Sequence, residues 1–334
     1  MEPLLDRLGR PLETLRISIT DRCNFRCVYC MPKEVFGRDY QFLERSQLLT
    51  LEEIARVARI FRELGVRTVR ITGGEPLVRR NVEHLVALLK EIDGLELALT
   101  TNGALLPQKA QALADAGLDR VTVSLDSVDD ATFRALNDVD FSVERVLGGI
   151  DAAAAAGLPV MVNAVVKRGV NDGAQLTALA EQFRGTGHVL RFIEYMDVGH
   201  TNGWRLDDVV SADEIVETIG ARWPLERVSG RKDETAVKYR YADGAGELGV
   251  IASVTKPFCG GCSRALLSAQ GELFTCLFGV KGRDLRAPLR EGAGDQELIA
   301  LLRGVWTRRT DRYSELRTAE TAASPKVEMS YIGG

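Results

Sequence analysis

The six cysteines of the chain fall into two triplets whose spacing could hold metal centres. The first triplet reads C-x3-C-x2-C and the second reads C-x2-C-x13-C, with no cysteine left over; the members are Cys23, Cys27 and Cys30, then Cys259, Cys262 and Cys276. Both triplets lie in segments rich in Asn, Gly, Pro and Ser, whereas cysteines that serve as apolar core residues would be spread over strands and helices. The pattern therefore predicts two metal or redox sites rather than core packing.

Three thiolates favour an iron–sulfur cluster over zinc. A [4Fe–4S] cluster held by three cysteines leaves one iron without a protein ligand, and an open coordination position is typical of a catalytic metal site. A structural zinc site is the alternative, but zinc usually takes four ligands. No histidine or fourth cysteine lies near the first triplet. Zinc stays a stronger alternative for the second triplet, whose spacing is less specific.

A β-then-α order runs through the first two thirds of the chain. Apolar, β-rich runs predict strands at 15–19, 68–71, 96–100, 120–125, 160–166 and 190–193. Apolar residues at helical spacing predict helices at 51–64, 82–92, 107–116, 143–156 and 174–183, with Gly65, Gly117 and Gly157 at helix ends. Six such units predict a parallel sheet with helices outside, either an open doubly wound sheet or a partial barrel. The chemistry of such folds lies at the carboxyl ends of the strands, where the first triplet follows 15–19.

The β/α order ends at about residue 219, which predicts one unit over 1–219 and a second over 220–334. Runs at 237–241 and 249–253 predict two strands of a smaller, antiparallel unit. The second cysteine triplet follows, then a helix at about 296–307 and a terminus of two glycines. The absence of a low-complexity linker predicts that the two units pack closely.

Composition excludes several classes of protein. The chain has 334 residues, of which 45% are hydrophobic and 27% charged, and its net charge of −4 provides no basic excess to bind nucleic acid. The N-terminus lacks the apolar segment of a signal peptide, and no run approaches the roughly 20 apolar residues of a membrane span. We therefore expect a cytoplasmic protein with reduced thiols, no membrane association and no nucleic-acid partner. The three histidines are scattered and are poor candidates for metal ligands.

Several motifs resemble a known family. C-x3-C-x2-C with an aromatic residue, Tyr29, before its last cysteine resembles the radical-SAM superfamily, and the turn Gly73-Gly74-Glu75-Pro76 after the second predicted strand resembles its second element. Glycine there would let the backbone approach a ligand. Further runs, TDRCNFRCVYCMP, RITGGEPLVRR, TTNG, VSLDS, RFIEYMDVG and the terminal YIGG, together with the second triplet, resemble the GTP 3′,8-cyclase family from residue 15 to residue 334. The resemblance implies a partial (β/α)6 TIM-like barrel of the radical-SAM type with a smaller C-terminal α+β unit that binds a cluster.

The resemblance also implies an activity. In this family S-adenosylmethionine (SAM) binds the open iron of the first cluster and is cleaved to a 5′-deoxyadenosyl radical, which abstracts the C3′ hydrogen of GTP. The C3′ radical attacks C8, and one electron and one proton complete (8S)-3′,8-cyclo-7,8-dihydroguanosine 5′-triphosphate, the first step of molybdenum cofactor biosynthesis. The implied partners are GTP, an electron donor and the downstream cyclic pyranopterin synthase. A homodimer is compatible with the sequence, which does not determine the oligomeric state.

The resemblance assigns roles to individual residues. Two [4Fe–4S] clusters would be held by the two triplets, and SAM would contact Tyr29, Gly74, Ser124 and Met196. GTP would contact Arg16, Arg70, Thr100, Arg191 and Arg264, of which Arg264 also serves in catalysis with the tail glycines Gly333 and Gly334. Arginine suits this task because its forked donors match phosphate oxygens. The alternative for each arginine is an ordinary solvated side chain.

Two positions depart from the family pattern. Met161 stands where the family usually has lysine, and Leu266 stands where it usually has a second arginine after Arg264. Two charge-assisted hydrogen bonds, each contributing roughly 1.5–3 kcal/mol, would be missing, which predicts GTP binding weaker by about two orders of magnitude or more. Lys167 or Arg168 would be the substitutes. Two alternatives follow: a radical-SAM enzyme with an auxiliary cluster acting on another substrate, such as a peptide, and a paralogue that binds SAM or nucleotide without turnover.

Overall fold

The computed structural model describes residues 3–230 and 234–333 of the chain. Its strands form a single sheet in the order β12-β11-β10-β1-β2-β3-β4-β5-β6-β9-β8-β7. Six strands follow one another in sequence order and are all parallel: β1 (Thr14–Ser18), β2 (Thr68–Thr72), β3 (Glu96–Thr101), β4 (Arg120–Ser124), β5 (Val160–Val166) and β6 (Val189–Glu194). The predicted partial barrel is confirmed.

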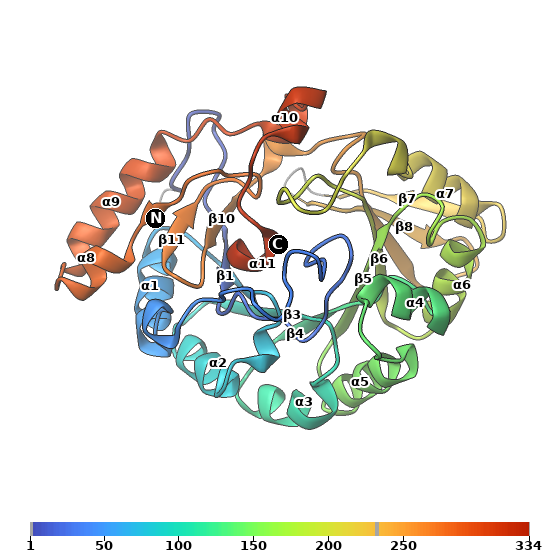
Figure 1. Ribbon diagram of the computed structural model, residues 1–334, viewed down its shortest axis with the longest axis horizontal. Coiled ribbons are helices and arrows are strands. Elements are labelled where there is room, and N and C mark those ends of the chain that lie inside the picture. The colour runs from blue at the N-terminus through green and yellow to red at the C-terminus, as the bar shows by residue number, and fades with distance from the viewer. Residues whose placement is uncertain (1–2, 231–233, 334) are drawn as a thin grey trace.

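Helices cover the outer face of the curved sheet (Figure 1). They are α1 (Leu51–Glu63), α2 (Val82–Lys90), α3 (Leu106–Asp115), α4 (Asp130–Asn137), α5 (Val143–Ala155), α6 (Ala174–Phe183) and α7 (Ala212–Gly220). In α1 the buried residues Ile54, Val57 and Phe61 recur at helical spacing and face the sheet. The same helix begins with a capping box, in which the Thr50 hydroxyl accepts a hydrogen bond from Glu53 N.

The C-terminal third of the chain extends the sheet at both edges. Its elements are β7 (Leu225–Val228), β8 (Val237–Tyr241), β9 (Glu247–Ile251), β10 (Arg264–Leu267), β11 (Glu272–Phe274), β12 (Arg283–Asp284), α8 (Arg286–Arg290), α9 (Asp295–Thr307), α10 (Ala319–Ala323) and α11 (Met329–Ile332). Short 3-10 turns lie at η1 (Arg45–Gln47), η2 (Pro76–Val78), η3 (Leu206–Asp208), η4 (Cys259–Gly261) and η5 (Tyr313–Glu315). The antiparallel pairing of β7, β8 and β9 is as predicted, but β9 also pairs parallel with β6, and β10 pairs parallel with β1. The division at residue 219 stays a prediction.

The strand register places arginines on the inner face of the sheet. Arg16 of β1 lies opposite Arg70 of β2, whereas their neighbours Leu15 and Ile17 point outward into the core beneath the helices. Alternate residues of a strand point to opposite faces, so the arginines occupy the inner face at the same level of two adjacent strands. A solvated surface position for these two arginines is therefore excluded.

The C-terminal segment enters the ring of strands from one side. In Figure 1 the C-terminus lies near the centre of the view, beside α11, and α11 contacts β1. Ile332 is fully buried and packs with Leu266 and Phe274. The predicted glycine tail therefore approaches the carboxyl ends of β1 and β2.

Most predicted elements agree with the structure within two residues at each end. Gly65, Gly117 and Gly157 adopt φ values of +110°, +95° and +79° directly after their helices, as C-terminal glycines commonly do. The helices α4 and α7 were not predicted, because each is short and begins in a loop that carries polar residues. No helix in the described ranges is long and apolar enough to cross a membrane.

Candidate functional site

The first cysteine triplet lies in the loop that follows β1, at the carboxyl end of the sheet. Cys23, Cys27 and Cys30 line one cavity, together with Gly73 and Gly74. The loop turns sharply between two ligands, because the backbone N–H of Cys30 donates to Cys27 O at 2.9 Å. The sequence spacing thus brings the three thiols to one wall of a cavity beside the glycine turn.

The glycine turn packs directly against the backbone of the cysteine loop. Gly74 N donates to Thr20 O at 2.8 Å, and a Cβ on Gly74 would lie 2.5 Å from Arg22 O. Any side chain at Gly74 would therefore push the two loops apart. The close approach of the two backbones is enough to explain why residue 74 is a glycine, and no bound ligand is needed for that explanation. The same contact fixes the turn relative to the thiols.

The thiols of the first triplet are held in an environment that disfavours free thiolates. Burial, with Glu75 as a further cause, raises the pKa of Cys23 to about 12, and burial with the neighbouring thiols also raises the pKa of Cys27 and of Cys30. A bound metal stabilises the thiolate form because it replaces the proton. Phe25 is buried beside the loop against Phe133 and Phe141. Three thiols at one cavity with an apolar backing fit a three-cysteine iron–sulfur cluster.

No group of three or more His, Cys, Asp and Glu side chains in the described part of the chain is placed to hold a single metal ion. A [4Fe–4S] cluster requires a wider arrangement, since each of its cysteines binds a different iron.

The four residues assigned to SAM lie around the first cavity and its neighbour. Gly74 lines the first cavity, Met196 lines the second, and Tyr29 and Ser124 line both. Tyr29 Oη donates a hydrogen bond of 2.6 Å to the buried Asp126 carboxylate, which accepts Val165 N at 2.8 Å with its other oxygen. The two cavities share Tyr29, Ser124 and Thr100, so they adjoin.

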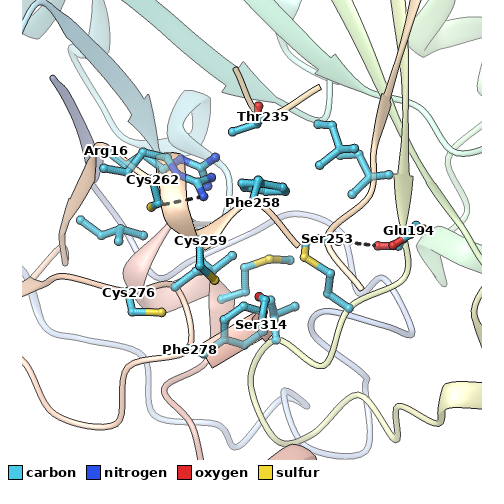
Figure 2. A pocket seen from close by; sticks show the side chains of 18 of the residues that line it. Arg16, Glu194, Thr235, Ser253, Phe258, Cys259, Cys262, Cys276, Phe278 and Ser314 are labelled. Carbon is cyan, nitrogen blue, oxygen red and sulfur yellow. Dashed lines mark hydrogen bonds between the residues drawn. The ribbon is translucent and has the colours of Figure 1, made fainter. Parts of the chain in front are cut away.

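The second cysteine triplet lines the second cavity (Figure 2). Cys259 and Cys262 lie on and after the turn η4, where Cys262 N donates to Cys259 O at 3.2 Å, and Cys276 follows β11. Burial raises the pKa of Cys276 to about 11. At Cys262 burial acts in the same direction, but Arg264 and Arg309 outweigh it and lower the pKa to about 6. These three thiols also fit a cluster with three cysteine ligands.

Four arginines from four strands converge on the second cavity. They are Arg16 of β1, Arg70 of β2, Arg191 of β6 and Arg264 of β10. Their hydrogen-bond partners are neutral groups or a thiol rather than carboxylates. Arg70 donates to the Thr100 and Thr122 hydroxyls, both at 3.1 Å; Arg191 donates to Asn163 Oδ1 at 2.9 Å, and Arg264 reaches Cys262 Sγ at 3.6 Å.

Burial lowers the pKa of two of these arginines, and neighbouring arginines add to the effect. Burial, with Arg264 as the next cause, lowers the pKa of Arg16 to about 9; burial and then Arg120 lower the pKa of Arg191 to about 10. The buried Nε of Arg16 has no hydrogen-bond partner. A cavity with several cations and an unpartnered donor binds an anion favourably, because the anion relieves the repulsion.

The two departures from the family pattern lie in different surroundings. Leu266 lines the second cavity but is 3% exposed and packs against Ile332 of the tail. Met161 is partly buried on β5, with its Sδ 3.8 Å from Arg120 Nη1. The substitutes considered from sequence are wrong: Lys167 Nζ lies 3.6 Å from Asp208 and Arg168 pairs with Glu214, and neither residue lines the cavity.

Two arginines at the second triplet were missed by the sequence analysis. Arg309 Nη1 donates to Cys262 O at 2.6 Å, and Arg10 Nη1 donates to Cys259 O at 2.9 Å. Both line the second cavity. Neither lies in a motif, and 249 sequence positions separate Arg10 from Cys259, so only tertiary contacts could identify them.

The tail brings Gly333 against the ends of β1 and β2. A Cβ on Gly333 would lie 2.4 Å from Thr72 Cγ2 and 3.2 Å from Ser18 Cβ, and its φ is +73°. Gly333 N donates to Met329 O at 2.8 Å. Gly334 lies outside the described residues.

Replacing Gly333 by alanine is expected to displace the tail, because the new methyl group overlaps the buried Thr72 side chain and the left-handed backbone disfavours alanine. Hydrogen exchange followed by mass spectrometry should show faster exchange at 329–333. Gly292→Ala is the matched control, since Gly292 has a φ of +88° but no atom within 4 Å of its Cβ position. Equal exchange in the two variants would contradict this prediction.

Comparisons with known proteins agree with this geometry. Residues 17–180 match the family model of the Radical SAM superfamily, and residues 188–315 match the model Molybdenum Cofactor Synthesis C. A GTP 3′,8-cyclase of Acidothermus cellulolyticus is 52% identical, with 100% of this chain and 99% of the relative covered. A GTP 3′,8-cyclase of Staphylococcus aureus is 46% identical, with both chains fully covered.

Among solved structures, Streptococcus suis SuiB bound to precursor peptide SuiA is similar with a TM-score of 0.50. The sequences are 19% identical, and the match covers 60% of this chain and 43% of SuiB. At this identity the likeness shows the fold alone, so the peptide of SuiB does not carry over to this chain.

Proposed function

Since this chain belongs to the GTP 3′,8-cyclase family of radical-SAM enzymes, we propose that its two adjoining cavities hold SAM and GTP for the first step of molybdenum cofactor biosynthesis. The first cavity, with Cys23, Cys27 and Cys30, takes the cluster that binds SAM. The second cavity takes the triphosphate and the base of GTP. The product is 3′,8-cyclo-7,8-dihydro-GTP.

The observation that carries this proposal is the convergence of four arginines beside a second cysteine triplet. Arg16, Arg70, Arg191 and Arg264 have no carboxylate among the hydrogen-bond partners described above, so a triphosphate would neutralise charges that now repel one another. Thr100 lines both cavities and fixes Arg70, which orients the substrate toward the first cavity. A peptide without acidic side chains would leave this positive charge unmatched.

Each group of residues has a distinct task in the proposed mechanism. When bound, the reduced first cluster and SAM supply the radical that removes hydrogen from the substrate. Tyr29, Gly74, Ser124 and Met196 hold SAM at the shared wall of the two cavities. The arginines hold GTP so that its ribose faces that wall, which orients the substrate toward the radical.

A second [4Fe–4S] cluster at Cys259, Cys262 and Cys276 is part of the proposal. Its open iron would meet the guanine base, with Arg264 beside it. We further propose that Gly333 and Gly334 complete the site from the tail. An external donor supplies electrons, and a cyclic pyranopterin synthase takes the product.

The proposal is tested by anaerobic turnover. The reconstituted protein is incubated with SAM, dithionite and GTP, and 5′-deoxyadenosine and cyclised nucleotide are followed by mass spectrometry. We expect both products and about eight iron atoms per chain. Absence of SAM cleavage would refute the radical activity, whereas SAM cleavage without a GTP-dependent product would refute only the substrate and favour a paralogue. An iron content of about four atoms per chain would exclude the second cluster.

Met161→Lys is expected to tighten GTP binding by about tenfold. Met161 does not itself line the second cavity, but it shares a face of β5 with the lining residues Asn163 and Val165, so a lysine there would extend its charge toward the cavity. One charge-assisted hydrogen bond contributes roughly 1.5–3 kcal/mol, and Arg120 opposes part of the gain. Equilibrium binding of GTP measures the effect, with Met161→Leu as the control. An unchanged dissociation constant would show that the missing lysine does not weaken binding.

Leu266→Arg is expected to behave differently from Met161→Lys. Leu266 is buried against Phe274 and Ile332, so a charge there would disturb the tail rather than simply add a phosphate contact. We expect the free energy of unfolding to fall by about 1–3 kcal/mol, as measured by urea titration of the iron-loaded protein. Full retention of stability together with tighter GTP binding would contradict this expectation.

A further inference from the structure

Arg309 lies in the loop after α9 and holds the second cysteine triplet from behind. Its side chain is 1% exposed. Nη1 donates to Cys262 O at 2.6 Å, Nη2 reaches Cys262 Sγ at 3.2 Å, and Nε donates to Thr275 O at 3.0 Å beside Cys276. One guanidinium therefore contacts a ligand sulfur, the backbone of Cys262 and the backbone beside Cys276.

A buried carboxylate fixes this guanidinium. Asp6 Oδ2 lies 3.3 Å from Arg309 Nη1 and 2.6 Å from Arg10 Nε, and the Asp6 side chain is 0% exposed. Arg10 in turn donates to Cys259 O at 2.9 Å and to Asp311 O at 2.7 Å. The N-terminal segment thus places two arginines on the second triplet through one carboxylate.

The first triplet has a different electrostatic surrounding. The sulfur of Cys23 is approached by neutral donors, Phe25 N at 3.4 Å and Asn102 Nδ2 at 3.9 Å. The carboxylate of Glu75, a residue that is 1% exposed, lines the same cavity as the three thiols. Arg26 Nη1 donates to Cys23 O at 2.9 Å, but in the described ranges no cation donates to a ligand sulfur of the first triplet. Arg264 and Arg309 both reach Cys262 Sγ, so the two triplets differ in whether a cationic donor contacts a ligand sulfur.

We infer that Arg309, held by Asp6, is a positioning residue that raises the reduction potential of the second cluster above that of the first. Reduction adds one negative charge to a cluster, and a cationic N–H donor at a ligand sulfur stabilises that charge. The inference rests on the proposed second cluster. This role of Arg309 does not require contact with SAM or GTP.

The test is an anaerobic redox titration of the reconstituted full chain, followed by electron paramagnetic resonance without GTP. The signal that changes on addition of SAM identifies the first cluster. We expect Arg309→Gln to shift the midpoint potential of the second cluster to a more negative value and to leave that of the first cluster unchanged. Arg308→Gln is the matched control, because Arg308 is the exposed neighbour of Arg309, and it should shift neither potential.

Two further variants separate tuning from mere support of the fold. Asp6→Asn removes a buried negative charge but keeps an amide oxygen that can accept a hydrogen bond from Arg309. With Arg309 still in place, the second potential should shift in the opposite, more positive direction. Arg309→Lys keeps the positive charge but loses the forked N–H donors of the guanidinium. It should shift the midpoint potential of the second cluster to a more negative value by less than Arg309→Gln does. If Asp6→Asn shifts the potential in the same direction as Arg309→Lys, or if neither variant shifts it, the inference is overturned.

Iron content distinguishes this failure from failure of the proposed function. An iron content of about four atoms per chain in the unmodified protein would exclude the second cluster, and it would refute the inference as well. About eight iron atoms with an unshifted potential in the Arg309 variants would overturn the inference alone. If Arg309→Gln loses iron, the Asp6→Asn variant tests the inference instead. Its expected shift in the midpoint potential of the second cluster is positive, opposite to that of the Arg309 variants.

Discussion

Replacing Cys27 by serine is expected to abolish formation of 5′-deoxyadenosine, whereas replacing Cys276 by serine is expected to spare it and abolish the cyclised nucleotide. Cys27 lies at the first cavity, where SAM is proposed to bind, and Cys276 lies at the second. Serine is a poor ligand for iron compared with a thiolate. Each variant should retain about four of about eight iron atoms per chain.

The two cysteine variants serve as controls for each other. Both remove one partly buried thiol from a loop at the rim of the sheet, so a general loss of structure would affect both products in both proteins. Mass spectrometry of the two products, with iron analysis of the same samples, checks the result. Cyclised product from the Cys276→Ser protein at the unmodified rate would exclude the second triplet from catalysis.

Replacing Arg70 by methionine is expected to weaken GTP binding by about 10- to 100-fold, because one charge-assisted contact contributes roughly 1.5–3 kcal/mol. Arg70 points to the inner face of β2 and is fixed by the hydroxyls of Thr100 and Thr122. Methionine keeps the length of the side chain while it removes the charge. The dissociation constant of GTP, measured anaerobically in the presence of SAM, gives the effect.

Arg67→Met is the matched control for Arg70→Met. Arg67 is exposed just before the same strand, so its replacement should leave GTP binding unchanged. SAM binding should also be unchanged in the Arg70 variant. Arg70 donates hydrogen bonds to Thr100 and Thr122, and neither of these residues is assigned to SAM. Equal loss of GTP binding in both variants would show that general surface charge, rather than the cavity, binds the nucleotide.

Local sequence patterns determined much of the fold and the metal chemistry. The alternation of apolar strands and amphipathic helices predicted six β/α units, and the glycines at 65, 117 and 157 marked helix ends by their need for positive φ. The cysteine spacings predicted which thiols gather at each cavity. These features depend on residues close in the sequence, so periodicity and spacing are enough to identify them.

Tertiary structure alone decided how the two cavities are built. Arg16 and Arg264 come from opposite ends of the chain, and they meet because β10 pairs with β1. Leu266, which departs from the family pattern, contacts Ile332 and so contributes to packing of the tail. The residue type alone could not reveal this contact.

The two cysteine triplets themselves illustrate the same division. The sequence determined which three cysteines form each triplet, because residue type and spacing are local properties. It did not determine that Asp6, Arg10 and Arg309 surround the second triplet. Charges buried by packing are set by segments about 300 residues apart in the chain, and no local pattern records which of them will meet.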